Sequence, residues 1–179
     1  MKLAVEAAAT DARSKGLDVF VIRPCITYGP GVRFNLASLM TAIRRGYYVH
    51  AGGVDPVRSF LSVDTAAAAI VHLLATKDAA RTYNLADREP VHLVEWVNDL
   101  ADRKRVRLPR TIPIGVLRAV AGLLSPARAM GFPVPLSHES LNKLTTSFSL
   151  DVSVLACSGF MWPSTSDKIL DEMVQSLKP

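Results

Sequence analysis

The residue types best suited to chemistry in this chain lie where apolar segments end. A run of β-branched and aromatic residues stops at Pro24, which cannot donate to a sheet ladder, and a glycine-bearing turn follows Tyr28. In open α/β sheets ligands bind beyond the carboxyl ends of the strands, so residues 24–28 are expected to line a site, with an ordinary loop as the alternative. Asn35 offers an amide donor at a predicted helix start, and Arg58 offers a forked guanidinium. Both types suit an anionic ligand, with a helix cap and an exposed surface charge as the alternatives.

These residues need a framework of helices and strands, and the hydrophobic periodicity predicts one. The expected strands cover residues 19–22, 47–49, 58–61 and 81–86. The expected helices cover residues 2–15, 34–45, 65–75, 91–103, 113–124, 137–144, 151–157 and 167–177. Asp64 is expected to cap the third of them. This order predicts an α/β fold with a mainly helical end, although the strands are too few for a doubly wound sheet that stands alone.

Composition excludes several classes of protein. With 179 residues, 49% of them apolar and 21% charged, the chain is long enough for a core and is not disordered. The longest apolar stretch is too short to span a bilayer and no signal peptide opens the chain, so we expect a cytoplasmic protein without a membrane partner. Two cysteines and four scattered histidines predict neither a disulfide framework nor a metal site. The net charge of +5 is modest, and no aromatic platform accompanies the basic run at 103–107, so nucleic acid is not favoured as a partner.

Four segments carry a resemblance to a known family. They are the strand exit at residues 21–31, residues 58–64 (RSFLSVD), residues 83–87 (YNLAD) and the closing segment at 151–163 (DVSVLACSGFMWP). In this order they resemble the extended short-chain dehydrogenases/reductases of the NAD-dependent epimerase/dehydratase family. The resemblance implies an α/β fold, the C-terminal part of a Rossmann-type parallel sheet followed by a mainly helical substrate-binding lobe.

The resemblance also suggests which part of such an enzyme is present. Lys2 and Glu6 match the lysine of the family's catalytic Tyr-x-x-x-Lys pair and the glutamate four residues after it. The tyrosine would precede Met1, and no Gly-x-x-Gly-x-x-Gly turn is present to seat a dinucleotide pyrophosphate. We therefore expect one partial domain. Residues 1–90 would be the last strands and helices of the Rossmann-like core with the substrate loop, and residues 91–179 the helical lobe.

The family's motifs imply roles for individual residues. Lys2 would be catalytic, because it would hold the nicotinamide ribose and lower the pKa of the tyrosine. The implied cofactor-binding residues are Lys2, Pro24, Cys25 and Ile26. The implied substrate-binding residues are Tyr28, Asn35 and Arg58, the last two at a diphosphate. The cofactor is NAD or NADP in the intact family, and we expect this chain alone to bind neither.

The resulting prediction is the substrate-binding portion of a sugar-nucleotide epimerase or dehydratase that is inactive alone. Ile26 stands where the family often has a polar residue, which favours a hydroxysteroid- or flavonol-type reductase as one alternative. A non-catalytic fragment or subunit is another. We expect a nucleotide-sugar substrate, and either a homodimer or pairing with the missing N-terminal half. Uncovered strand edges predict an aggregated, oligomeric or partly molten protein.

Overall fold

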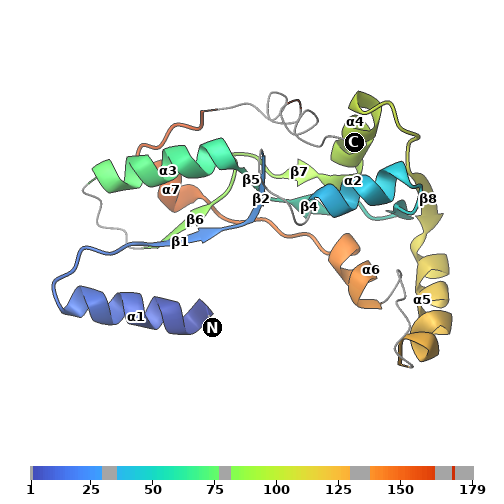
Figure 1. Ribbon diagram of the computed structural model, residues 1–179, viewed down its shortest axis with the longest axis horizontal. Helices are drawn as coiled ribbons and strands as arrows, with labels where there is room; N and C mark the ends of the chain where they lie inside the picture. Colours follow the sequence, from blue (N-terminus) through green and yellow to red (C-terminus); the bar gives the residue numbers. More distant parts are fainter. Residues whose placement is uncertain (1, 30–35, 77–81, 130–137, 164–170, 172–179) are drawn as a thin grey trace.

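The computed structural model describes residues 2–29, 36–76, 82–129, 138–163 and 171. The helices are α1 (Lys2–Ser14), α2 (Leu36–Arg44), α3 (Val63–Ala75), α4 (Leu93–Arg103), α5 (Ile114–Ala129), α6 (His138–Thr145) and α7 (Ser153–Cys157). The strands are β1 (Val21–Pro24), β2 (Ile26–Tyr28), β3 (Val49–Gly52), β4 (Val57–Arg58), β5 (Phe60–Ser62), β6 (Thr82–Leu85), β7 (Val91–His92) and β8 (Arg110–Pro113). Figure 1 shows an elongated arrangement, with α1, α3, α7, β1 and β6 at one end and α5, α6 and β8 at the other. The predicted α/β class is confirmed.

Within the described residues the strands form four pairs. β1 pairs in parallel with β6, β2 with β5, and β3 with β8, whereas β4 and β7 are antiparallel. Parallel pairs need crossover connections, and helices supply them here. β1 and β6 pair with each other, with Val21 opposite Thr82 and Pro24 opposite Leu85, and among the described residues neither has a second strand neighbour.

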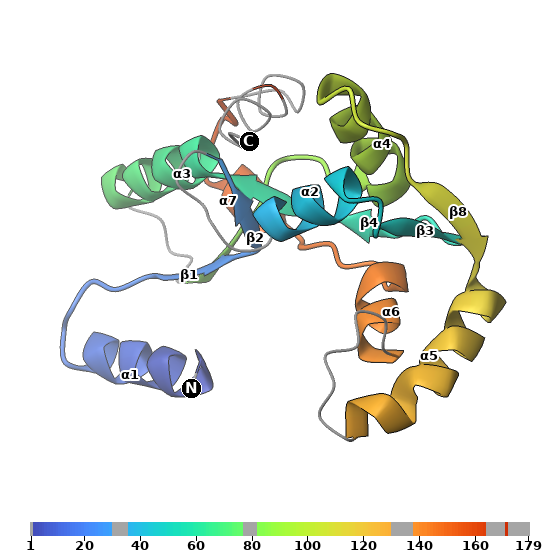
Figure 2. The same ribbon diagram turned by 45° about the vertical axis from the view of Figure 1, so that its right-hand side comes forward.

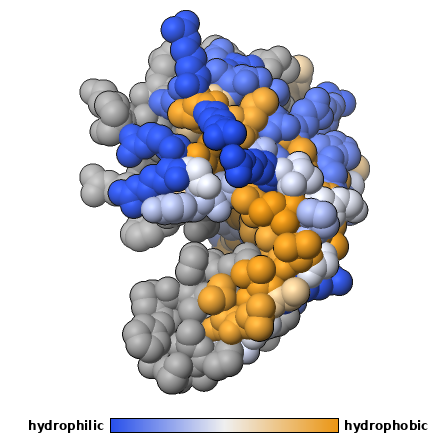
Figure 3. All heavy atoms as spheres, turned by 90° about the vertical axis from the view of Figure 1, so that its right-hand side faces the viewer, coloured by the Kyte–Doolittle hydropathy of each residue, from blue (hydrophilic) through white to orange (hydrophobic). Residues whose placement is uncertain are grey.

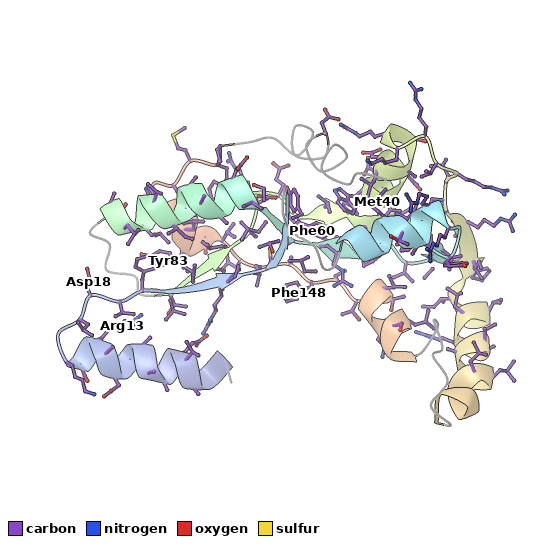
Figure 4. The ribbon with its side chains drawn as sticks, viewed as in Figure 1. Arg13, Asp18, Met40, Phe60, Tyr83 and Phe148 are labelled. Atoms are coloured by element: carbon purple, nitrogen blue, oxygen red, sulfur yellow. The ribbon has the colours of Figure 1, made fainter. Side chains whose placement is uncertain are left out.

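A first core cluster lies between α3, α7 and β6. Leu73 comes from α3, Tyr83 from β6 and Leu155 from α7, and all three are buried. Figure 4 shows Tyr83 between the α3 and β1 layers. The chain after α7 is fixed by Trp162, whose indole N–H donates to the carbonyl of Ala86 at 3.0 Å. The closing segment of the sequence therefore covers β6 and completes this core.

A second cluster joins α2 and α4 to the β2–β5 pair. Phe60 is central, because its ring stacks on Trp96 with centroids 4.9 Å apart and meets the edge of Tyr28 at 6.0 Å. Met40 of α2 and Leu100 of α4 are buried in the same cluster, and Figure 4 labels Met40 and Phe60 on α2 and β5. Such aromatic contacts stabilise a core beyond the effect of area alone.

A third, smaller cluster forms the far end of the molecule. Leu117 and Ala121 of α5 pack with Leu141 of α6 and with the β3–β8 pair. Figure 2 shows α5 and α6 side by side below β3 and β8. Among the described helices, none combines the length and apolarity that crossing a bilayer requires.

The cap of α3 differs from the prediction. Ser62, not Asp64, is the N-cap: its backbone is extended, and its Oγ accepts from the Thr65 N–H at 2.9 Å. A side-chain oxygen three residues before an amide has the reach that capping needs. Asp64 lies inside the first turn, where its charge complements the helix dipole.

Two strands begin two residues later than predicted. β1 begins at Val21 rather than residue 19, and the carbonyl of Val19 instead accepts from Arg13 Nε at 2.7 Å. β3 begins at Val49 rather than residue 47. The amides of Tyr47 and Tyr48 both donate to the carbonyl of Ala42, so these residues close α2. The helix expected at 167–177 and the start of the one expected at 34–45 lie outside the described residues.

Candidate functional site

The carboxyl ends of β1 and β6 meet the first residues of β2 and β5. The amide of Cys25, just after β1, donates to the carbonyl of Leu85 at the end of β6 at 3.1 Å. The amide of Asp87 donates to the carbonyl of Phe60 in β5 at 2.7 Å. β2 pairs with β5, so its last residue, Tyr28, lies opposite Ser62. β1 and β6 end here, and α/β proteins bind ligands beyond the carboxyl ends of parallel strands.

The carboxylate of Asp87 links the strand ends. One oxygen accepts from the Tyr28 hydroxyl at 2.5 Å, and the other accepts from the backbone N–H of Ser62 at 3.2 Å. Hydrogen bonds to an ionised acceptor are stronger than neutral ones. The Tyr28 ring is buried, so this carboxylate fixes the hydroxyl within the core. Asp87 therefore holds the end of β2 against the start of α3.

The turn after β2 needs glycine because it lies against α3. Gly29 has φ +132°, and a Cβ atom there would come within 2.7 Å of Cγ2 of Val63. A non-glycine residue would meet both backbone strain and a steric clash. The glycine that the sequence analysis placed in a turn thus permits close approach of the strand exit to the first residue of a helix.

The residues between β1 and β2 differ in exposure. Pro24 is exposed, whereas Cys25 and Ile26 are partly buried and pack against two different core clusters. Burial raises the pKa of the Cys25 thiol to about 12, and the charge of Asp87 adds to the effect. The thiol therefore remains protonated at neutral pH, which is unsuited to nucleophilic chemistry.

Helix α1 runs antiparallel to β1. Arg13 contacts Val19 before the strand, while Glu6 forms a bidentate ion pair with Arg23 inside it, at 2.9 and 2.6 Å. Figure 4 shows Arg13 at the end of α1 that connects to the strand. Since Lys2 lies one helical turn before Glu6, its backbone lies toward the carboxyl end of β1. The structure thus places the backbone of Lys2 at the same end as residues 24–28, and its side chain is outside what is described.

The ion pair between Glu6 and Arg23 shifts the pKa of both side chains. The hydrogen bond and charge of Arg23 lower the pKa of Glu6, and those of Glu6 raise the pKa of Arg23. Both side chains are substantially exposed, so the pair contributes modestly to stability. Its main effect is to orient α1 along the strand.

Arg58 lies in a second polar group. It is partly buried in β4 and lies opposite Val91 of β7. Its backbone also forms an isolated parallel β-bridge with Phe148. Burial raises the pKa of the Tyr48 hydroxyl to about 12, and the positive charge of Arg58 acts in the opposite direction. The Tyr48 ring meets the edge of His50 at 5.3 Å, and His50 Nε2 is 3.0 Å from Asn98 Oδ1.

The predicted site residues therefore occupy two groups. Pro24, Cys25, Ile26 and Tyr28 follow one another through the strand junction, and the backbone of Lys2 lies toward the same side. Arg58 lies in β4, where its charge acts on Tyr48, and Asn35 is outside the described residues. Within the described ranges, no group of three or more His, Cys, Asp or Glu side chains could hold a metal ion.

Two residues of these groups were not predicted from the sequence. Asp87 was predicted only as the end of a strand-exit motif, although an acidic residue directly after a buried strand is a signal for a site. Tyr48 was read as part of a strand, and only the tertiary structure brings it near Arg58.

A family model confirms the resemblance. The model of the NAD dependent epimerase/dehydratase family matches residues 1–86. This range runs from α1 to the end of β6 and contains both Lys2 and the strand-exit segment. The resemblance stated from the sequence motifs is therefore confirmed for this half of the chain.

Individual proteins agree with the family model. UDP-glucose 4-epimerase of Vibrio cholerae is 28% identical over 151 residues, which are 79% of this chain and 41% of that protein. UDP-glucuronic acid 4-epimerase from Bacillus cereus, solved in complex with NAD, matches 98% of this chain and 49% of its own at 14% identity and a TM-score of 0.67. RMD from Pseudomonas aeruginosa, complexed with NADPH, matches 98% of this chain and 54% of its own at 20% identity and a TM-score of 0.64. This chain thus spans about half the length of these relatives, or less, and shares the fold of the structures.

Proposed function

We propose that this chain, whose residues 1–86 match the NAD dependent epimerase/dehydratase family, is the C-terminal, substrate-binding portion of a sugar-nucleotide epimerase or dehydratase. In this proposal residues 1–90 are the last part of a Rossmann-like core and residues 91–179 are the substrate lobe. A single observation carries the proposal. The strand-exit segment and Asp87 follow the carboxyl ends of β1 and β6, where the Tyr28 hydroxyl reaches the Asp87 carboxylate, with the backbone of Lys2 toward the same end.

The fit to a dinucleotide is partial. Pro24, Cys25 and Ile26 form a short segment at the strand ends that would border a nicotinamide. The sequence lacks the glycine-rich turn that would seat the pyrophosphate. When bound, NAD or NADP would supply hydride transfer in this family. The protonated Cys25 and the apolar Ile26 would exclude water beside it, and Lys2 would lower the pKa of a proton-carrying tyrosine from the N-terminal half.

Different residues would bind the substrate. Arg58 would bind a diphosphate through its guanidinium, and Asn35 would add an amide donor. Tyr28 would act as a positioning residue, because its hydroxyl is held by Asp87 and its ring is buried. The active cytoplasmic enzyme would then need an N-terminal half with the glycine-rich turn and the tyrosine, with which this chain would pair.

Calorimetric titration with UDP-glucose and with NAD⁺, each added alone, tests the proposal. We expect measurable binding of the UDP-sugar and no heat with NAD⁺. Arg58→Gln should weaken UDP-sugar binding on the order of tenfold, since a charge-assisted hydrogen bond to phosphate is worth about 1.5–3 kcal/mol. Arg88→Gln, at an exposed arginine in the loop after β6, is the matched control and should leave the affinity unchanged.

Two outcomes would contradict the proposal. A micromolar dissociation constant for NAD⁺ would mean that this chain builds its own dinucleotide site. UDP-sugar binding that Arg58→Gln and Arg88→Gln affect equally would remove the diphosphate role of Arg58. A steroid ligand that binds where the UDP-sugar does not would favour the hydroxysteroid-type reductase instead.

A further inference from the structure

Helix α5 is apolar on its outer face as well as on its inner face. Leu117 and Ala121 are buried against α6 and the β3–β8 pair. On the outside, Val116, Val120 and Leu123 follow the helical period and are 51%, 38% and 81% exposed. A surface helix of a soluble domain usually carries polar residues on its outer face. An exposed apolar stripe of this kind marks a surface that binds something.

The surroundings of this stripe are strongly basic. Residues 103–138 contain no Asp or Glu and seven Lys or Arg: Arg103, Lys104, Arg105, Arg107, Arg110, Arg118 and Arg128. Since the whole chain has a net charge of +5, the remainder is net negative. Arg105, Arg107, Arg110 and Arg118 are exposed, and no carboxylate among the described residues forms an ion pair with them. The positive charge of the protein is thus concentrated beside one apolar helix face.

The basic and apolar parts form one continuous surface. β8 begins at Arg110 and leads directly into α5 at Ile114. At the start of β8, Arg110 lines a surface pocket of about 280 Å³ together with Arg107, Leu108 and Tyr48. Figure 3 faces this side of the molecule and shows an apolar band along the helix, with strongly hydrophilic side chains gathered above it. Two arginines and Leu108, which is 49% exposed, are thus among the residues that line this pocket.

We propose that this face, formed by α5 and residues 103–110, docks onto an anionic lipid surface. Interfacial helices combine an apolar stripe that enters the acyl boundary with Lys and Arg residues that contact anionic head groups. The apolar stripe on α5 and the flanking arginines supply both parts, and the pocket between Arg107 and Arg110 has the charge to receive a lipid phosphate. Docking of this kind needs no membrane-spanning helix.

The positive charge of this face favours a lipid surface over a second copy of the chain as its binding partner. In a twofold dimer built on this face, the basic residues of one copy would face those of the other. Like charges at such short range oppose association. An anionic leaflet complements them instead, and each basic residue near its surface contributes about 1 kcal/mol, or roughly a fivefold gain in binding.

Vesicle flotation of the full chain tests this proposal, because aggregated protein does not float. We expect the protein to float with phosphatidylcholine vesicles that contain phosphatidylserine, and not with phosphatidylcholine alone. High salt should reduce the binding, since it screens exposed charges. Arg107→Glu should reduce the partition coefficient on the order of 25-fold, because the reversal both removes an attraction and adds a repulsion. Leu123→Glu should reduce it at least about tenfold through lost apolar burial.

Matched controls lie outside the proposed face. Leu74→Glu on α3 places the same charge at a leucine that is 71% exposed, and Arg88→Glu reverses an exposed arginine outside the basic segment. Both should float like the unaltered protein. The proposal is overturned if the unaltered chain does not float, if it floats equally on neutral vesicles, or if the controls are impaired as much as the α5 variants. A dimer in sedimentation velocity that Leu123→Glu dissociates, with no flotation, would assign the face to a second copy.

Discussion

We predict that Asp87 and Tyr28 are energetically coupled, and that loss of either disturbs the junction of the four strands. The perturbations are Asp87→Ala, Tyr28→Phe and the two together. The carboxylate accepts two hydrogen bonds, from the Tyr28 hydroxyl at 2.5 Å and from the Ser62 N–H at 3.2 Å. Asp87→Ala therefore leaves both donors without this partner.

The expected size follows from these two contacts. A hydrogen bond to a charged group contributes about 1.5–3 kcal/mol, so Asp87→Ala should lower the free energy of unfolding by about 3–5 kcal/mol. Tyr28→Phe loses one bond, and the partly exposed carboxylate of Asp87 can take water instead, so about 1–2 kcal/mol is expected. In the Asp87→Ala background the hydrogen bond between this hydroxyl and the carboxylate is already absent, so Tyr28→Phe should cost about 1–2 kcal/mol less than in the unaltered protein. The coupling energy should therefore be about 1–2 kcal/mol.

Urea denaturation followed by tryptophan fluorescence measures these values. Trp162 is a suitable reporter because its indole donates to Ala86, next to Asp87. Glu89→Ala, at an exposed carboxylate in the same loop, is the control and should change stability by less than about 0.5 kcal/mol. If Tyr28→Phe costs the same with and without Asp87, the two side chains are independent and the reasoning is refuted. If Asp87→Ala does not fold, Asp87→Asn supplies the second arm of the cycle.

Three further predictions concern neighbouring features. Gly29→Ala should cost more than about 2 kcal/mol in the same denaturation assay, whereas Gly16→Ala, with positive φ but open space around it, should cost about 1 kcal/mol; equal costs would remove the steric argument. Ser62→Ala should destabilise by about 1 kcal/mol through the lost cap of α3, and helix-selective amide exchange at the first turn should increase; unchanged exchange would contradict the assignment. The folded-state pKa of Glu6 lies below its ordinary value of 4.5, so its ion pair with Arg23 stabilises the protein above that pH and is lost as pH falls through the folded-state pKa. Glu6→Gln should therefore flatten the stability–pH curve in that acid range, and an unchanged curve would show that the pair does not form in solution.

Local sequence signals determined the kinds of element and the strand-exit motif. The alternation of apolar runs and helical periodicities predicted the α/β class, because the periods of strands and helices differ in any chain. Pro24 and Gly29 were placed at the end of a strand and in a turn for reasons that act within a few residues. The family motifs also depend on short segments, so the resemblance to the epimerase/dehydratase family needed no coordinates.

The predicted boundaries of the helices and strands were less accurate, since a boundary depends on which group forms a hydrogen bond with each backbone atom. Val19 was expected in a strand, but its carbonyl accepts from Arg13. Asp64 was expected to cap α3, but Ser62 has the extended backbone and the reach to do so. In both cases two local arrangements were chemically possible, and packing selected one.

The tertiary structure alone decided which chemistry-bearing side chains lie together. Tyr28 and Asp87 are 59 residues apart in the chain and share a hydrogen bond because the carboxyl end of β6 meets the β2–β5 pair. Arg58, expected to bind a diphosphate, lies in β4, where its positive charge acts on the hydroxyl of Tyr48. The sequence states which groups are present and which local conformations they permit. Contacts between remote segments depend on strand pairing and on the burial of apolar faces against one another, and these are properties of the whole folded chain.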